Sequence, residues 1–295
     1  MISIDEYLEQ IYEDMRRQIE NGEQLCELKD LTFEAGSLPD YTNVQIQRLY
    51  LLRYAFAYAF EYELMYRAVL SDLEIDNEIM VASIGCGTMI DYWALAQVIE
   101  KQRLDYGVRY IGIDTIDWQY RFEGREGDSV RFVQRNAEQM FRMNRQLMSD
   151  VYFFPKSISE FSEREMDEIV ENFRTKPIYK DVIFVCISLR ANEASMQRDL
   201  ERTRMLIEAL EDNGFSASQD CDEYCEYSEN VGIIACDNSY CYPEEVLQYI
   251  SNLNRECEYF SIWGENCDES CLCLNRFPVL KTGLMRYQVI KFERV

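Results

Sequence analysis

Two glycines and one carboxylate have the spacing of a nucleoside-binding site. Gly85 and Gly87 follow the apolar run MVASI at 80–84, and Asp114 ends a second apolar run, VRYIGID, at 108–114. A glycine lets the backbone turn tightly and come closer to a ligand than a residue with a Cβ atom can. A carboxylate at the end of the next strand can accept hydrogen bonds from both hydroxyls of a ribose. The pair therefore predicts a pocket for a nucleoside.

The elements that must position these residues are a strand, a turn and a helix. The run at 80–84 has the length and composition of a buried strand, and the stretch from 90 to 99 has helical spacing. Strand, glycine turn and helix form the first unit of a nucleotide-binding α/β sheet, in which ligands lie at the carboxyl ends of the strands. The residues expected on the inward face of that helix are Ile90, Trp93, Ala94, Val98 and Ile99.

These two segments resemble motifs I and II of the class I S-adenosylmethionine-dependent methyltransferases. In that family the first strand usually ends acid-apolar-Gly-x-Gly-x-Gly. Here Ser83 stands in place of the acid and Met89 in place of the third glycine, which predicts a slightly wider turn. A dinucleotide motif, Gly-x-Gly-x-x-Gly, fits less well because Ile90 occupies its last position. The resemblance covers about residues 75–215.

The resemblance implies S-adenosylmethionine as cofactor and assigns its contacts to the ends of the first four strands. Asp114 would hold the ribose, Thr115 would line the adenine, and the backbone of the glycine turn would approach the cofactor. Asn136 would bind the adenine edge or cap a helix, and Lys156 would face the acceptor or lie at the surface. The predicted cofactor contacts are Ser83, Gly85, Cys86, Gly87, Asp114, Thr115, Asn136, Ala137, Phe154 and Pro155, and the residues predicted to face the acceptor are Lys156 and Ser157.

The rest of the chain predicts a Rossmann-like, doubly wound, mostly parallel sheet of the α/β class. Further strands are expected at 130–133, 151–154 and 181–189, with helices at 163–174 and 195–213, so that strands and helices alternate for five rounds. The alternating run at 287–292 predicts an antiparallel C-terminal strand beside the fifth strand. We expect residues 76–295 to form this domain, with an insertion at about 215–275 that contains a helix at 243–253.

Residues 1–75 predict an N-terminal helical region. Ser3 and Glu6 have the spacing of a capping box, and a helix from Ser3 should reach about Ile19. A second helix is expected at 43–70, where tyrosines recur every four residues. These tyrosines either belong to a buried helix whose hydroxyls find partners at its rim, or cover a ligand pocket at one end. They are Tyr50, Tyr54, Tyr58, Tyr62 and Tyr66.

The insertion is rich in cysteine and acid. With 11 cysteines in the chain and no signal peptide at its start, reduced thiols are expected. Cys221 and Cys225 together with the later group Cys267, Cys271 and Cys273 could bind zinc, but their spacing lacks two clean C-x2-C pairs. We favour free cysteines and no metal.

The net charge of −24 disfavours nucleic acid as a partner. A group of six arginines keeps an RNA methyltransferase open as an alternative, although acids are interleaved with them; they are Arg121, Arg125, Arg131, Arg135, Arg142 and Arg145. No apolar run reaches the length of a membrane span, and a cytoplasmic location is expected.

We expect a methyltransferase acting on a small molecule or a protein. Because the chain has no histidine, a proton from the acceptor must go to another group, and no catalytic base is identified from the sequence. An inactive S-adenosylmethionine-binding regulatory or scaffold protein is the main alternative.

Overall fold

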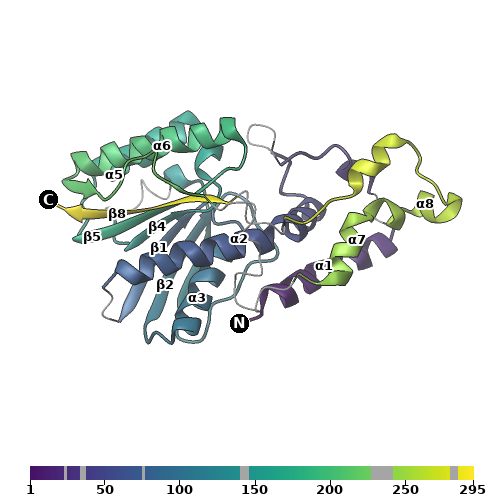
Figure 1. Ribbon diagram of the computed structural model, residues 1–295, viewed down its shortest axis with the longest axis horizontal. Helices are drawn as coiled ribbons and strands as arrows, with labels where there is room; N and C mark the ends of the chain where they lie inside the picture. Colours follow the sequence, from purple (N-terminus) through teal and green to yellow (C-terminus); the bar gives the residue numbers. More distant parts are fainter. Residues whose placement is uncertain (23–24, 34–37, 75–76, 140–145, 227–241, 280–284) are drawn as a thin grey trace.

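A single mixed sheet of eight strands organises the protein (Figure 1). The computed structural model describes residues 1–22, 25–33, 38–74, 77–139, 146–226, 242–279 and 285–295. The strands are β1 (Glu78–Ile84), β2 (Gly107–Asp114), β3 (Ser129–Gln134), β4 (Val151–Phe154), β5 (Val182–Leu189), β6 (Phe215–Ala217), β7 (Cys225–Glu226) and β8 (Arg286–Arg294).

The strand order confirms the predicted Rossmann-like, doubly wound fold. The order is β3-β2-β1-β4-β5-β8-β6, and β7 also pairs with β8. Strands β1 to β5 pair in parallel, with Val81 opposite both Tyr110 and Val151. Strand β8 runs antiparallel to β5 and β6, as predicted for the C-terminal strand. The order reverses between β1 and β4, which is where such sheets bind their ligands.

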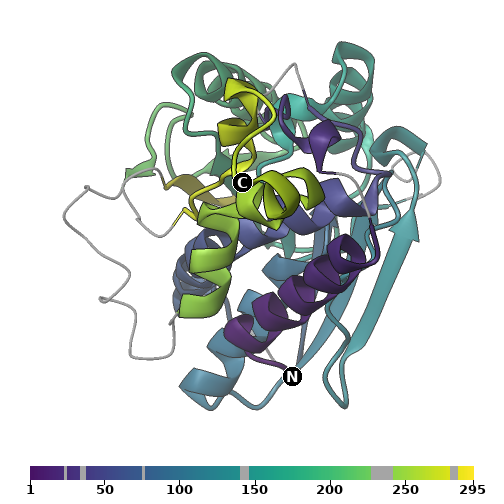
Figure 2. The ribbon, with the colours of Figure 1, turned by 90° about the vertical axis from the view of Figure 1, so that its right-hand side faces the viewer.

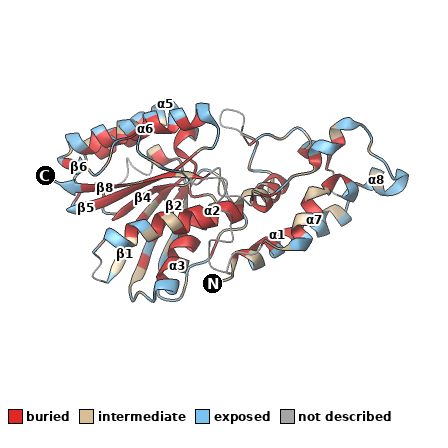
Figure 3. Cartoon of the chain, in the orientation of Figure 1, coloured by how far each residue is buried: buried red, intermediate tan, exposed pale blue. Residues whose placement is uncertain are grey.

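Helices cover both faces of the sheet. Helices α2 (Val44–Asp72) and α3 (Ile90–Gln102) lie on one face, and α5 (Glu163–Thr175) and α6 (Glu193–Asp212) lie on the other (Figure 1). Alternate strand residues enter the two cores, so Phe153 packs toward α2 while Tyr152 and Phe154 pack toward α5. Figure 3 shows the buried strands between these layers.

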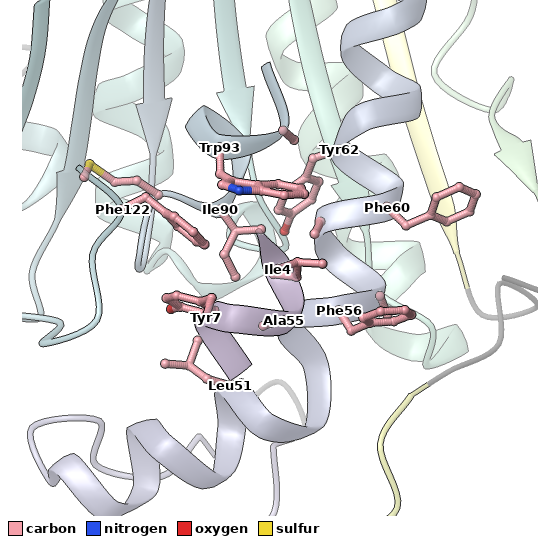
Figure 4. Close-up of a cluster of buried hydrophobic side chains, with 14 of the residues drawn as sticks. Ile4, Tyr7, Leu51, Ala55, Phe56, Phe60, Tyr62, Ile90, Trp93 and Phe122 are labelled. Atoms are coloured by element: carbon pink, nitrogen blue, oxygen red, sulfur yellow. The ribbon is translucent and has the colours of Figure 1, made fainter. Parts of the chain in front are cut away.

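The N-terminal helices share the first of these cores. Helix α1 (Ile4–Glu20) begins at the predicted capping box, in which the Ser3 hydroxyl accepts from Glu6 N and the Glu6 carboxylate accepts from Ser3 N. The indole of Trp93 donates to Ile2 O at 2.9 Å. Figure 4 shows side chains of α1, α2 and α3 gathered in one cluster, including Ile4, Ala55 and Trp93. Helices α1 and α2 therefore help to build the sheet domain. No described helix is long and apolar enough to cross a membrane.

The connection between β2 and β3 differs from the predicted alternation because residues 115–128 contain no helix. Side-chain contacts hold this loop instead. The Tyr92 hydroxyl donates to Asp128 at 2.7 Å, and Gln119 N donates to the Gln47 side chain at 3.0 Å. Arg125 pairs with Asp128 at 2.9 Å. The loop thus lies against α2 and α3, where it contributes to the site described below.

The segment expected to be an insertion has two parts. Its first residues form β6 and β7, which join the sheet beside β8, so the sheet extends further than the sequence indicated. Its later part contains α7 (Glu244–Ser251) and α8 (Glu258–Trp263), together with the short 3-10 helices η5 (Leu253–Glu256) and η6 (Glu269–Leu274). Helix α7 packs beside α1, with the rings of Tyr12 and Tyr249 5.0 Å apart (Figures 1 and 2).

Polar contacts join the segment around η6 to the residues that follow η1 (Cys26–Leu28). Lys29, next to η1, pairs with Asp268 at 3.3 Å, and Arg276 donates to Leu31 O at 3.0 Å. The nine cysteines that the structure describes are all free thiols. Within the described residues, no three Cys, Asp or Glu side chains are grouped so that they could hold a metal ion.

Candidate functional site

The glycine turn after β1 is fixed by its neighbours on both sides. Gly85 N and Cys86 N donate to Ile113 O at 2.8 and 3.1 Å. Gly85 has φ +75°, and a Cβ atom placed on it would lie 2.4 Å from the Cβ of Ser157. Gly87 also has a left-handed φ of +53°. Both positions therefore favour glycine by conformation, and at Gly85 the close approach of Ser157 also leaves no room for a Cβ atom.

Asp114 lies directly against this turn. Its carboxylate accepts from Gly87 N at 2.8 Å and from Ile116 N at 2.9 Å. Burial raises the pKa of Asp114, and the backbone donors of Ile116 and Gly87 oppose that shift. Trp118 and the backbone of Thr115 also act on this carboxylate, which lines the cavity described below. The glycine turn and the carboxylate are adjacent, as the nucleoside-pocket hypothesis requires.

Met89 takes the conformation that a third glycine would adopt. It has φ 61° and ψ 36°, in the left-handed region, and precedes the first residue of α3. Its N–H donates to Cys86 O at 2.8 Å, which closes a tight turn, so the wider turn expected from the sequence is wrong. The left-handed conformation costs a non-glycine residue about 1–2 kcal/mol. The buried Met89 side chain offsets part of this cost by packing in the core.

A cavity of about 370 Å³ opens above the turn, within the usual range for small-molecule sites. It lies at the carboxyl ends of the strands, near the point where the strand order reverses. Most of the residues predicted from the sequence line it: Gly85, Cys86, Gly87, Asp114, Thr115, Ala137, Pro155, Lys156 and Ser157. Cys86 lines the cavity with its backbone, because its buried thiol packs toward Gly112.

Three predicted contacts do not line this cavity. Ser83 is fully buried in β1, with its hydroxyl toward Asp91 and Tyr110. Asn136 caps the backbone by accepting from Glu138 N at 2.8 Å, and its amide donates to Glu165. Phe154 is fully buried against Phe161 in the core on the α5 side. Strand alternation explains Ser83 and Phe154, since both side chains point into the sheet's helical layers.

Aromatic side chains from distant segments complete the cavity wall. Trp118 comes from the β2–β3 loop, and its ring lies 5.1 Å from Tyr41 and 5.8 Å from Tyr50. Tyr58 and Tyr62 of α2 also line the cavity, which favours the hypothesis that the tyrosine-rich helix covers a pocket. Burial raises the pKa of Tyr50 and Tyr58 well above the ordinary value, so both rings stay neutral. The four-residue repeat pointed to these tyrosines, whereas no sequence pattern pointed to Trp118.

Lys156 is buried, so its interpretation as a surface lysine is wrong. Its ammonium donates to Glu61 at 2.9 Å and to Leu189 O at 2.5 Å, and the Ser188 hydroxyl also donates to Glu61. Burial raises the pKa of Glu61 and lowers that of Lys156, while their mutual attraction opposes both shifts. Glu61 was not identified from the sequence because it lies 95 residues from its partner.

No family model and no curated protein matches the chain. Among solved structures, an S-adenosylmethionine-dependent methyltransferase from Archaeoglobus fulgidus is 15% identical, covers 79% of this chain and 92% of its own, and has a TM-score of 0.39. The plantazolicin methyltransferase in complex with SAH is 10% identical over 97% of this chain and 100% of its own, with a TM-score of 0.41. A cyclopropane-fatty-acyl-phospholipid synthase-like protein from Lactobacillus casei is 12% identical over 91% and 98%, with a TM-score of 0.41. The fold of this chain rests on its own strand order and pairing.

Proposed function

We propose that this protein is an S-adenosylmethionine-dependent methyltransferase. The observation that carries the proposal is the contact between Gly87 N and the Asp114 carboxylate on the wall of the 370 Å³ cavity. A bare backbone turn and a strand-terminal carboxylate at the switch point of a doubly wound sheet suit the adenosine half of the cofactor. Asp114 would hold the ribose hydroxyls, and Thr115 and Ala137 would line the adenine.

The cavity wall also suits the other half of the cofactor. S-adenosylmethionine carries a sulfonium cation, which makes its methyl group electrophilic. The neutral rings of Tyr50, Tyr58 and Trp118 line the cavity and offer faces that attract a cation. Such a protein accelerates the reaction mainly by holding the acceptor in position and keeping the site dry.

The alternative of an RNA methyltransferase has less support. Arg121 pairs with Asp117 at 2.5 Å, and Arg125 pairs with Asp128 at 2.9 Å, so both are already neutralised. Arg142 and Arg145 lie outside the described residues. An inactive cofactor-binding protein would share the same pocket, and a transfer assay separates it from an enzyme.

Calorimetric titration with S-adenosylmethionine tests the site. We expect Asp114→Asn to weaken binding at least about 10-fold, because hydrogen bonds to a charged group contribute about 1.5–3 kcal/mol. Asp105→Asn is the matched control, since Asp105 is exposed before β2 and should leave the affinity unchanged. Equal affinities for the two variants would remove Asp114 from the site, and no binding to the unaltered protein would refute the proposed cofactor.

Transfer of a radiolabelled methyl group to a fractionated lysate tests turnover. Label in a small-molecule or protein fraction is the expected result. Label that disappears after nuclease treatment would favour the RNA alternative. Cofactor binding without any transfer would favour the regulatory protein.

A further inference from the structure

A second cavity lies next to the first and shares two residues with it. Its volume is about 180 Å³, and Tyr58 and Lys156 line both cavities. It sits beyond the carboxyl ends of β4 and β5, where Lys156 follows one strand and Arg190 follows the other. The apolar part of its wall consists of Phe33, Tyr54, Ala57, Val279 and Met285.

The size of this cavity sets the size of its occupant. An apolar cavity of about 150 Å³ binds benzene, so the second cavity fits one substituted ring. Its aromatic and aliphatic wall favours such a ring over a flexible polar chain.

The polar end of the cavity selects the group on that ring. Glu61 and Lys156 line it, and both side chains are almost fully buried. Glu61 offers a hydrogen-bond acceptor, and Lys156 brings a positive charge to the same end. Both carboxylate oxygens of Glu61 lie 2.9 Å from the Lys156 ammonium, which also donates to Leu189 O. A hydroxyl group can donate to the Glu61 carboxylate and place its oxygen beside the Lys156 ammonium, so it suits both charges. A protonated amine would face the Lys156 ammonium, and a carboxylate would face the Glu61 carboxylate. Arg190 also lines the cavity, but its guanidinium already pairs with Glu160 and donates to Lys156 O.

We propose that the second cavity binds the methyl acceptor, that the acceptor is a single-ring phenol, and that Glu61 removes its proton while Lys156 stabilises the oxygen. This inference rests on the proposed function. In the balanced step the phenol oxygen forms a bond to the methyl carbon, the carbon–sulfur bond breaks with its electron pair on sulfur, and the phenol proton goes to Glu61. The products are an aryl methyl ether and S-adenosylhomocysteine. Glu61 supplies the base in a chain without histidine.

Binding is the first test, and it does not depend on turnover. With S-adenosylhomocysteine present, p-cresol, benzylamine and benzoate are titrated separately into the full-length protein. We expect p-cresol to bind at least about 10-fold more tightly than the other two. Val279→Phe, which fills the half-buried end of the cavity, should abolish p-cresol binding and leave the cofactor affinity unchanged. Stronger binding of benzylamine or benzoate, or no p-cresol binding by a protein that binds the cofactor, would overturn the inference.

Transfer of the methyl group is the second test. On p-cresol, Glu61→Gln should lose at least about 100-fold in turnover, the usual size of general-base catalysis. On 4-nitrophenol, which is already largely ionised at about pH 8, turnover should stay the same or rise, because no base is needed and the variant removes the charge that repels the phenolate. A merely structural role for Glu61 would reduce both rates equally and would refute the assignment.

Two further variants separate chemistry from folding. Glu63→Gln breaks another buried ion pair of α2, with Lys101 at 2.8 Å, away from both cavities, and should leave the ratio of the two rates unchanged. The double variant Glu61→Gln/Lys156→Met removes both charges, so no buried charge is left unpaired. It should fold and bind the cofactor but show no transfer to either phenol. If the unaltered protein does not bind S-adenosylmethionine, that result refutes the proposed function and not only the phenol inference.

Discussion

The buried carboxyl group of Asp91 provides the most direct test of how burial changes a pKa near the glycine turn. It lies in the first turn of α3 with no exposed surface, and its carboxylate accepts from the Tyr110 hydroxyl at 2.9 and 3.0 Å. Burial raises the pKa of Asp91 from 3.8 to about 7, and the neighbouring hydroxyl and backbone donors only partly oppose that shift. In the unfolded chain the group returns to its ordinary pKa.

The sign of the effect on stability follows from proton binding. Because the folded state holds the Asp91 proton more tightly, the protein loses stability as the pH rises from about 4 through about 7. The raised pKa of Asp91 lowers the free energy of unfolding by about 4 kcal/mol at pH 8 and by about 1.5 kcal/mol at pH 5, compared with a carboxyl group of ordinary pKa. An asparagine has no such proton. The stability of Asp91→Asn relative to the unaltered protein should therefore increase by about 2.5 kcal/mol between pH 5 and pH 8.

Denaturant unfolding of both proteins at the two pH values measures this difference. Asp105→Asn removes the same charge from an exposed loop and should show no pH-dependent change. If the difference between Asp91→Asn and the unaltered protein is the same at both pH values within about 0.5 kcal/mol, the buried carboxylate does not carry the shifted pKa and the reasoning is refuted.

Two other predictions concern the turn and the first helix. Gly85→Ala should destabilise the protein by more than about 2 kcal/mol and abolish cofactor binding, since the new Cβ would meet Ser157 and the residue has φ +75°. Adding Ser157→Gly should recover part of the lost stability, and a single variant as stable as the unaltered protein in denaturant would contradict the geometry. Ser3→Ala should cost about 1 kcal/mol in unfolding free energy through loss of the helix cap, whereas Ser261→Ala, at an exposed hydroxyl of α8, should change stability by less than about 0.5 kcal/mol.

Local sequence pattern decided much of the fold. The parallel strands, α2 and α3, the capping box at Ser3 and the antiparallel C-terminal strand all follow from hydrophobic periodicity and turn residues. Once Gly85 and Asp114 are assigned to the ends of adjacent parallel strands, topology alone brings them together. For that reason the core of the candidate site could be predicted without coordinates.

Contacts between side chains that lie far apart in the sequence were determined only by the tertiary structure. The rotation of α2 sets Glu61 beside Lys156, and the path of the β2–β3 loop brings Trp118 over Gly87. The pleat of β1 turns Ser83 away from the cavity, although its position in the motif suggested a ligand contact. A sequence fixes which residues an element contains, whereas packing of whole helices and loops against the sheet fixes which polar groups are buried together. In this protein the contact between Gly87 and Asp114 belongs to the first kind of information, and the Glu61–Lys156 pair belongs to the second.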